Sequence, residues 1–595
     1  MKIVVRWQHL ALWSLTLLGL GLRLYNVNWD QGNNFHPDER EILFHVTAFK
    51  WPTSWTQFLD PVHSPLNPHF FAYGSFPLYL LALVAHVLGY DLADPANFVK
   101  ITLVGRVISA LFDSGSILLS GWLALLLVRK SSFSSAWNVA LFAAALVVFT
   151  PLQLQLSHFY AVDTMLVFFV TFTLLSCVML AETEKFLRWA VIAGVAYGLA
   201  LATKFSAAPL AVPLCIALFL HWYRRQDIVP SCLALLLVAG VTLLIFFSTQ
   251  PYALLDIHNY VEQVAEQSTI ARGTFDVPFI RQFAGTIPYV YQLQNMVVWG
   301  MGLLAGISAL IGFCWLTWQS RRPEYRLWLI VLSWIAIYVA ITGSFYVKFM
   351  RYMLPVYPLL SVVAAVALFA LIGKLRWSGE SSPARFDRYL PTLRRCLLGI
   401  VLVGTIFQGL ALLNVYSAPN TRVQASRWIY AHIAEGSVLT YEQWDDPLPV
   451  AVDGNDPAVF KQATYTVGGQ TVTGLDLYGD DTLQKAQQLA QLLPTLNAIT
   501  MATDRLDKSI PRLPTRYPLT IRYYQLLYSG QLGFHLAAQF ENHPHLLGIT
   551  LDDSNADESY SVFDHPTARI FVRENPYPYT SQQVLQKLLA GIQLP

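Results

Sequence analysis

Nine ionisable side chains of this chain lie at the edges of long apolar stretches or in the first long loop between them. They are Arg23, Asp38, Glu39, Arg106, His158, Asp163, Lys204, Lys348 and Arg351. Charged groups close to a membrane are costly, so each is a hypothesis for a functional site. Arginine and lysine can neutralise a departing phosphate, and a carboxylate can accept the proton of an attacking hydroxyl. These residue types together favour a site for an anionic lipid headgroup.

Each of these residues could also have an ordinary structural role. His36-Pro37-Asp38-Glu39 is typical of a helix start, because proline suits the first turn and acids favour the positive end of the helix dipole. Asp163 could cap a helix, His158 could be a packed imidazole, and the cations could anchor helices at the interface: Arg23, Arg106, Lys204, Lys348 and Arg351. A shared location would favour one functional site over many separate structural roles.

The composition indicates an integral membrane protein. Of 595 residues, 55% are hydrophobic and 13% are charged, whereas a soluble protein has about 25% charged residues. The net charge of +2 gives no sign of a nucleic-acid partner. The five cysteines lie in or beside apolar stretches and none forms a CxxC pair, so we expect neither a disulfide framework nor a zinc knuckle.

The apolar stretches that must position these residues are long enough to cross a bilayer, which needs about 20 residues per helix. We predict eleven spans, at 9–25, 106–128, 137–151, 161–181, 189–204, 206–221, 229–249, 296–318, 326–343, 351–373 and 395–415. The first is expected to be retained rather than cleaved as a signal peptide. A further apolar stretch, 76–90, is expected to lie along the outer interface.

Basic residues set the predicted orientation, since they concentrate in cytoplasmic loops. The clusters fall before the first span and in every second loop: Lys2 and Arg6, Arg129-Lys130, Lys185 and Arg188, Arg224-Arg225, Arg321-Arg322, and Lys374, Arg376 and Arg394-Arg395. The N-terminus and the polar loop 375–393 are therefore expected in the cytoplasm and the C-terminus outside, in a bacterial plasma membrane. With this orientation, all nine candidate residues lie on the outer face.

The predicted fold class is an all-α polytopic membrane domain followed by a soluble α/β domain. Residues 1–415 form the membrane domain, with long outer loops at 26–105 and 250–295. After residue 415 the long apolar stretches stop, and short strand-like segments such as 437–441 alternate with helical ones such as 483–493. Residues 416–595 are therefore expected to form one extracytoplasmic domain.

Six stretches carry a resemblance to a known group, in the same order along residues 23–355. They are Arg23-Leu-Tyr-Asn26, His36-Pro-Asp-Glu-Arg40, Gly105-Arg-Val-Ile-Ser109, Ser157-His-Phe-Tyr-Ala-Val-Asp163, Leu201-Ala-Thr-Lys-Phe205 and Lys348-Phe-Met-Arg-Tyr-Met-Leu-Pro355. In them the chain resembles the lipid-carrier-dependent glycosyltransferases of the GT-C fold, in the protein O-mannosyltransferase and aminoarabinose-transferase group.

The resemblance implies a membrane enzyme that moves a sugar from a polyprenyl-phosphate carrier to an acceptor hydroxyl on the outer membrane face, with inversion. Asp38 matches the catalytic base, and Glu39 is its partner, which orders the site or a metal. Lys204 matches the lysine that holds the carrier phosphate. The other residues expected to bind the carrier phosphate are Arg23, Arg106, Lys348 and Arg351. His158 and Asp163 are expected to line the same pocket.

The chain also departs from the group. Aminoarabinose transferases carry a Lys-Pro-Pro-type motif late in the first outer loop, whereas residues 67–75 contain no lysine. His63 and His69 in this region are candidate ligands for a divalent metal, and no organic cofactor is expected. Loop 250–295 is too short for the β-trefoil domain of the eukaryotic mannosyltransferases. The acceptor, which could be a protein, lipid or glycan, is left open.

Two other classes of protein remain as alternatives. A transporter or flippase of a lipid-linked or anionic substrate would show inverted repeats and charges near the membrane midplane. Here no repeat is evident, and the candidate charges share one predicted face. A receptor with an outer sensory domain would not need an Asp-Glu pair beside a set of cations.

Overall fold

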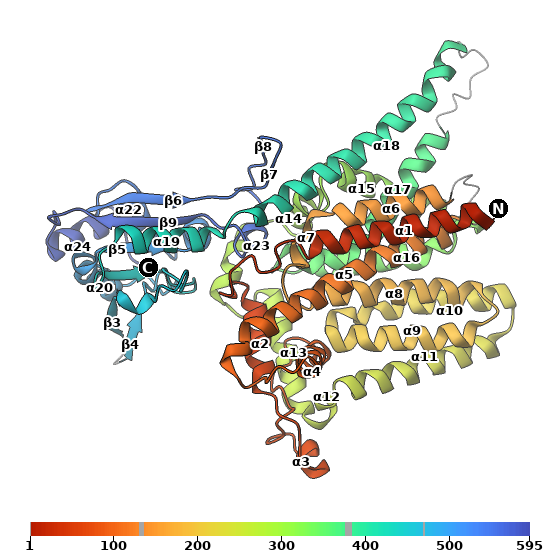
Figure 1. The fold of residues 1–595 in the computed structure, drawn as a ribbon, viewed down its shortest axis with the longest axis horizontal. Coiled ribbons are helices and arrows are strands. Elements are labelled where there is room, and N and C mark those ends of the chain that lie inside the picture. Colours follow the sequence, from red (N-terminus) through yellow and green to blue (C-terminus); the bar gives the residue numbers. More distant parts are fainter. Residues whose placement is uncertain (1, 130–135, 375–383, 468–469) are drawn as a thin grey trace. The chain divides into compact units, whose positions relative to one another are not determined.

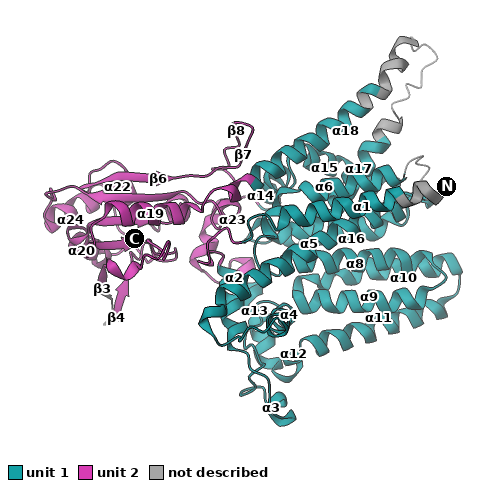
Figure 2. Ribbon diagram, viewed as in Figure 1, with its two compact units in different colours: residues 1–27, 37–269, 288–413 teal, residues 28–36, 270–287, 414–595 magenta. Residues whose placement is uncertain are grey.

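A computed structural model describes residues 2–129, 136–374, 384–467 and 470–595, in two compact units (Figures 1 and 2). Unit 1 comprises Met1–Val27, Pro37–Thr269 and Pro288–Leu413. Unit 2 comprises Asn28–His36, Ile270–Ile287 and Asn414–Pro595. These units differ from the expected division into 1–415 and 416–595, because residues 28–36 and 270–287, one segment of each long loop, belong to unit 2.

Unit 1 is helical, and each of the eleven predicted apolar stretches forms a helix. These helices are α1 (Lys2–Arg23), α5 (Phe98–Val128), α6 (Ala136–Phe149), α8 (Asp163–Glu182), α9 (Phe186–Thr203), α10 (Ala211–Arg225), α11 (Ile228–Thr249), α15 (Leu303–Gln319), α16 (Trp328–Gly343), α17 (Tyr357–Lys374) and α18 (Ala384–Leu413). The predicted fold class, helical membrane domain first and α/β domain second, is confirmed.

Seven segments among the described residues are long and apolar enough to cross a membrane: Pro95–Val128, Asp163–Glu182, Phe186–Thr203, Phe205–Arg225, Ile228–Thr249, Met350–Ala370 and Arg395–His432. The chain is an integral, multi-pass membrane protein. Eleven as the number of spans stays a prediction, as does their orientation. Lys130, Arg376 and most of the predicted loop 375–393 lie outside the described residues.

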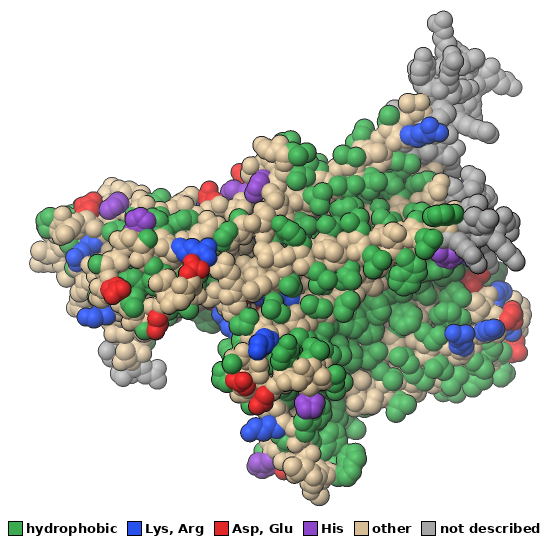
Figure 3. Space-filling view, in the orientation of Figure 1, with side chains coloured by type: hydrophobic (Ala, Val, Ile, Leu, Met, Phe, Trp, Pro, Cys, Tyr) green, Lys and Arg blue, Asp and Glu red, His purple; other side chains and the backbone are tan. Residues whose placement is uncertain are grey.

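The apolar helices differ in how much of their surface the protein covers. The apolar window of α8 is 83% buried, whereas that of α11 is 22% buried. Figure 3 shows hydrophobic side chains covering the face over α9, α10 and α11, where α11 exposes Leu236, Leu243 and Leu244. A helix that is apolar on every side needs either protein or lipid around it, so α8 is a central helix and α11 a lipid-facing one.

Short helices connect these long ones. They are α2 (Pro37–Ala48), α3 (Trp55–Leu59), α4 (Ser75–Val87), α7 (Pro151–Leu156), η2 (Phe205–Leu210), α12 (Tyr252–Leu255), α13 (Ile257–Arg272), α14 (Val290–Asn295), η4 (Met296–Gly300) and η6 (Met350–Val356). Three candidate residues lie in them: Asp38 and Glu39 in α2 and Arg351 in η6. Prolines 209 and 355 lie inside η2 and η6; a proline interrupts α-helical hydrogen bonding.

The apolar stretch expected to lie along the interface forms α4, which has 13 residues. Figure 1 shows α4 nearly end-on, while α8, α9, α10 and α11 are seen from the side. Because 13 residues are too few for a bilayer and α4 runs across the bundle direction, α4 is not built as a span. Its position at the outer interface stays a prediction.

Unit 2 is built on a five-stranded sheet with the order β2-β1-β5-β9-β6. The strands are β1 (Val438–Tyr441), β2 (Lys461–Gln462), β5 (Ala498–Met501), β6 (Phe534–Phe540) and β9 (Ala568–Arg573). Strand β1 runs parallel to β2 and β5, and β9 runs antiparallel to β5 and β6. Two-stranded ribbons are formed by β3 (Thr464–Val467) with β4 (Gln470–Thr473) and by β7 (His545–Leu546) with β8 (Ile549–Thr550).

Helices cover this sheet and complete its apolar core. They are α19 (Thr421–His432), α20 (Leu483–Leu492), α21 (Arg505–Ser509), α22 (Pro518–Tyr528), α23 (Glu558–Ser561) and α24 (Ser581–Leu589). Ile499 and Met501 of β5 pack in one buried cluster with Tyr523 of α22 and Val584 of α24. The predicted strand 437–441 and helix 483–493 correspond to β1 and α20.

The two loop segments of unit 2 are held by specific side chains. Arg281 donates from Nη1 to the Tyr478 carbonyl at 2.9 Å and to the Tyr517 hydroxyl at 2.5 Å. The Arg422 guanidinium lies 4.7 Å from the centre of the Phe35 ring. These contacts account for the membership of sequence-distant segments in the C-terminal unit.

Candidate active site

Arg23 lies in a fully buried ion pair inside the helical unit. Its Nε is 2.5 Å from Oδ2 of Asp113, and neither side chain is exposed. Its other nitrogens donate to the carbonyls of Gly19, Val147 and Val148. Arg23 therefore connects α1 to α5 and α6. None of these contacts is with another candidate residue.

Arg106 and Glu39 form a second fully buried pair. Arg106 donates from Nε and Nη2 to the two oxygens of Glu39, at 2.9 and 2.7 Å, and neither side chain is exposed. Glu39 Oε1 also accepts from the Tyr160 amide at 2.9 Å, and Arg106 Nη1 donates to the Val27 carbonyl at 2.8 Å. This bidentate geometry is strong and directional, so the pair fixes the start of α2 against α5.

Asp38, next to Glu39, lies in a different environment. Its Oδ2 pairs with Nη1 of Arg351, which comes from η6, and the two side chains are 16% and 14% exposed. Successive residues of a helix point in different directions, so Glu39 faces the bundle while Asp38 keeps contact with solvent. The burial of Glu39 thereby orients Asp38.

Asp163 and Lys204 form a second partly exposed pair. Lys204 Nζ donates to Asp163 Oδ1 at 2.9 Å, and the lysine side chain is 17% exposed. Asp163 is the first residue of α8. Lys204 has extended backbone between α9 and η2, so it lies at the break between these two helices.

Aromatic residues join the two partly exposed pairs. Tyr352 follows Arg351 in the chain, and its ring centre lies 5.3 Å from Lys204 Nζ; the Tyr73 ring lies 5.8 Å from the same atom. Such cation–π contacts hold a cation without neutralising it. Asp38, Arg351, Tyr352, Lys204 and Asp163 therefore form one cluster, which we call the rim cluster.

A glycine brings Tyr73 to this cluster. The Gly74 amide donates to the Thr203 carbonyl at 3.0 Å, and a Cβ at Gly74 would lie 1.8 Å from the Ala202 carbonyl oxygen. No larger residue fits at this approach of the first outer loop to the end of α9. Burial first, and then the charge of Asp163, raise the pKa of the Tyr73 phenol well above its ordinary value, so this hydroxyl remains a proton donor.

Glu41 and His45 of α2 were missed by the sequence reasoning. They follow Asp38 at helical spacing, and Glu41 Oε1 is 3.3 Å from His45 Nε2. The His45 ring stacks on Phe70 with 4.5 Å between ring centres, and the charge of Glu41 acts on Tyr73. The spacing of Asp38, Glu41 and His45 was the available signal, because residues three or four apart share one helix face.

Two further candidates, His158 and Lys348, are buried and bond to backbone carbonyls. His158 is fully buried, with Nδ1 2.7 Å from the Leu154 carbonyl and Nε2 2.9 Å from the Tyr25 carbonyl. It links the end of α1 to α7, so its contacts are those of a packed histidine. Lys348 is 3% exposed and donates to the Tyr346 carbonyl at 2.7 Å.

The two candidate metal ligands do not come together. His63 pairs with Asp60 at 3.0 Å, and His69 Nδ1 is 3.7 Å from Asp256 Oδ2. Among the described residues, no group of three or more His, Cys, Asp or Glu side chains has a geometry for a metal ion. Glu39 also fits a metal poorly, because both of its oxygens accept hydrogen bonds from Arg106.

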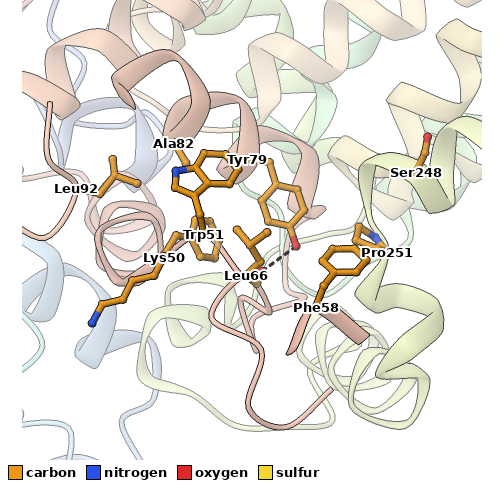
Figure 4. A pocket seen from close by; sticks show the side chains of 10 residues that line it. Lys50, Trp51, Phe58, Leu66, Tyr79, Ala82, Leu92, Ser248 and Pro251 are labelled. Atoms are coloured by element: carbon orange, nitrogen blue, oxygen red, sulfur yellow. Dashed lines mark hydrogen bonds between the residues drawn. The ribbon is translucent and has the colours of Figure 1, made fainter. Parts of the chain in front are cut away.

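A cavity of about 190 Å³ lies beside the first outer loop, apart from the rim cluster. Its wall includes Trp51, Phe58, Leu66 and Tyr79, and Figure 4 shows the Tyr79 hydroxyl bonded to the Leu66 backbone. The Lys50 ammonium points away from the cavity in the same view. The wall is therefore apolar, and the charges that could act in a transfer reaction are elsewhere.

Residues 97–252 match the family model described as "Dolichyl-phosphate-mannose-protein mannosyltransferase". The resemblance predicted from the sequence is confirmed. The matched segment contains Arg106, His158, Asp163 and Lys204. It therefore includes the Lys204–Asp163 pair of the rim cluster. Asp38 and Arg351 lie outside it.

Three solved structures are similar to this chain at low identity. Oligosaccharyltransferase AglB from Archaeoglobus fulgidus, in complex with an inhibitory peptide and a dolichol-phosphate, has a TM-score of 0.49 and 13% identity, covering 92% of this chain and 75% of that one. ArnT from Cupriavidus metallidurans, bound to undecaprenyl phosphate, has a TM-score of 0.43 and 15% identity, covering 84% and 94%.

The third is the S. cerevisiae protein O-mannosyltransferase Pmt1-Pmt2 complex bound to the sugar donor, with a TM-score of 0.32 and 17% identity, covering 42% of this chain and 34% of that one. At these values no residue role passes from the three structures to this chain. No curated protein matches the chain at a significant level.

Proposed function

We propose that this protein is a membrane glycosyltransferase that moves a sugar from a polyprenyl-phosphate carrier to an acceptor hydroxyl at the outer face of the membrane. The observation that carries the proposal is the partly exposed Asp38–Arg351 pair, joined through Tyr352 to the Lys204–Asp163 pair. The cluster holds two carboxylates at helix starts, of which Asp38 is the more exposed, and two partly exposed cations. The family match over residues 97–252 supports the same reaction class.

Asp38 is the general base in this proposal. It accepts the proton of the acceptor hydroxyl, whose oxygen forms a bond to the anomeric carbon as the bond between that carbon and the phosphate oxygen breaks. The electron pair of the broken bond leaves with the polyprenyl phosphate. A single displacement of this kind inverts the anomeric centre. Arg351 keeps Asp38 ionised, because a nearby positive charge favours the carboxylate.

Lys204 and Arg351 bind the carrier phosphate in this proposal. The charge on the departing phosphate grows during the reaction, and accessible cations stabilise it. Arg23 and Arg106 are not among the residues that bind the phosphate, because their guanidinium groups are fully buried against protein acceptors. Glu39 is a positioning residue: it holds the start of α2 so that Asp38 faces the substrates.

The test is transfer by the Asp38→Asn variant in detergent with a labelled polyprenyl-phosphate sugar. Asparagine keeps the shape and cannot take the proton, so we expect a loss of about 10²- to 10⁴-fold with an unchanged melting temperature. Asp91→Asn is the matched control, because Asp91 is an exposed acid of the same outer loop. Activity of Asp38→Asn near that of the native protein would overturn the assignment of the base.

A further inference from the structure

The β7–β8 hairpin of unit 2 presents apolar side chains at its tip. Leu546 pairs with Ile549, so the turn consists of Leu547 and Gly548, whose φ angles are +52° and +79°. Leu547 is 89% exposed and Ile549 is 56% exposed. Turns of this kind favour asparagine or aspartate at the first position, and a bulky residue with positive φ is strained. The needs of the turn therefore do not account for leucine at position 547.

Two asparagines tie the base of this hairpin to the residues that follow the last apolar helix. Asn414 Nδ2 donates to the His545 carbonyl at 3.0 Å. Asn542 Nδ2 donates to the Val415 carbonyl at 2.9 Å. Both bonds lie within unit 2, and they fix the hairpin at the point where the chain leaves α18.

A chain of charged residues reinforces this attachment. His543 Nδ1 is 2.6 Å from Asp553 Oδ1, Asp553 Oδ2 is 2.7 Å from His565 Nε2, and His565 Nδ1 is 2.6 Å from Asp564 Oδ1. Tyr416 donates its hydroxyl hydrogen to Asp564 Oδ2 at 2.6 Å. Burial opposes the charge on His565, but the carboxylates of Asp564 and Asp553 outweigh it and raise its pKa to about 10. At neutral pH His565 is therefore charged, and it holds both carboxylates in place.

The position of Asn414 along the sequence places the hairpin at a membrane surface. Helix α18 ends at Leu413, and its final residues are the apolar series Gly409-Leu-Ala-Leu-Leu413. Asn414 is the first polar residue after this span. The tip lies two residues beyond His545, or about 7 Å in a strand. The interfacial layer on each side of a bilayer is roughly 5–8 Å thick, so the tip stays within reach of the lipid headgroups.

We infer that the Leu547–Ile549 tip inserts into the interface of the leaflet at which α18 ends, and anchors the C-terminal unit to the membrane surface. An exposed apolar tip in water has no compensating contact, whereas burial in the interface recovers the hydrophobic free energy of both side chains. An anchor must be firmly attached to the unit that it holds, and the hydrogen bonds and ion pairs at the base of the hairpin provide this attachment. This inference concerns lipid as the partner, and it holds whatever sugar the protein transfers.

The test uses the full-length chain in phosphatidylcholine–phosphatidylglycerol nanodiscs, with the five native cysteines replaced by serine. A nitroxide is attached at Leu547→Cys or, as a matched control, at Leu483→Cys. Leu483 is 50% exposed at the start of α20 in the same unit. We expect the label at 547 to collide more with dissolved oxygen than with a water-soluble nickel chelate, and the label at 483 to show the reverse. Equal behaviour of the two labels would overturn the inference.

A second measurement keeps the native cysteines, in case the replaced background does not fold. Amide hydrogen exchange of residues 543–551 is compared in nanodiscs between the native protein and Leu547→Asp. A charge at the tip should expel it from the interface and raise exchange across the hairpin, while Leu483→Asp leaves the hairpin unchanged. If Leu547→Asp exchanges as slowly as the native protein, the tip faces water and the inference is wrong.

Discussion

Two sets of ion pairs in the helical unit consist of the same residue types but differ in their exposure to solvent. Arg23–Asp113 and Arg106–Glu39 are fully buried, and their donors are satisfied by protein acceptors. The rim cluster pairs are instead 14–17% exposed on their cationic side chains. A buried cation whose bonds are all made by protein cannot receive a phosphate without breaking the fold. A partly exposed one can exchange its carboxylate for a substrate oxygen.

This difference in burial distinguishes structural residues from candidate site residues, even where the two are neighbours in the sequence. Asp38 and Glu39 are adjacent on α2, yet Glu39 is enclosed by Arg106 and the Tyr160 amide while Asp38 reaches Arg351 on η6. In the proposed function, the buried pair orients α2 and the partly exposed pair supplies the groups that react. Substitutions can therefore test whether a residue belongs to the set in which the structure places it.

The largest effect on stability is expected from Arg106→Met. Removing one partner leaves Glu39 as an unpaired buried charge, which costs about 3–5 kcal/mol. Thermal unfolding in detergent measures this loss, and Lys100→Met is the control because Lys100 is exposed on the same helix, α5. If Arg106→Met unfolds at the native temperature but no longer binds the carrier, Arg106 belongs to the site and the comparison fails.

Lys204→Met should give the opposite pattern. The Lys204 side chain is 17% exposed and that of its partner Asp163 is 3% exposed. Because this pair keeps some contact with solvent, we expect a smaller loss of stability than in Arg106→Met. Loss of one charge-assisted phosphate contact should weaken binding of a polyprenyl phosphate by about 1.5–3 kcal/mol, or roughly ten- to a hundredfold. Binding is measured with a fluorescent polyprenyl phosphate, and Lys50→Met of the first outer loop is the control. Native affinity in Lys204→Met would make Lys204 an interface anchor.

Tyr352 offers a finer test, with a smaller effect. Tyr352→Leu removes the ring beside Lys204, and cation–π contacts are worth about 0.5–2 kcal/mol. Carrier binding should weaken accordingly, whereas Tyr352→Phe keeps the ring and should retain it. If the phenylalanine variant loses as much as the leucine variant, the hydroxyl rather than the ring joins the two pairs, and the account of the cluster must change.

Much of the helical unit could be predicted from hydropathy alone. Each predicted apolar stretch became a helix, because apolar runs of this length satisfy their backbone only by helix formation in lipid. The assignment of residues 28–36 and 270–287 to the C-terminal unit could not be predicted. It depends on single contacts such as Arg281 with Tyr478 and Tyr517, which leave no periodic signal in the sequence.

The site was predicted only in part for a related reason. Sequence indicates that a charge near an apolar stretch needs a partner, but it does not say which partner. Asp113 lies inside the apolar stretch of α5, and that position was a signal for a buried cation nearby, which the structure shows to be Arg23. The placement of Asp38 and Lys204 depends on η6 and on the approach of Gly74 to α9, which are tertiary features.

The central claim is that the carrier phosphate binds at the rim cluster and not at the buried pairs. The most direct measurement is an electron-density or cryo-electron-microscopy map of the full-length protein with a bound polyprenyl phosphate. The account predicts phosphate density in contact with Lys204 and Arg351, beside Asp38, with the Arg23–Asp113 and Arg106–Glu39 pairs intact. Phosphate density against Arg23 or Arg106, with either buried pair opened, would contradict it.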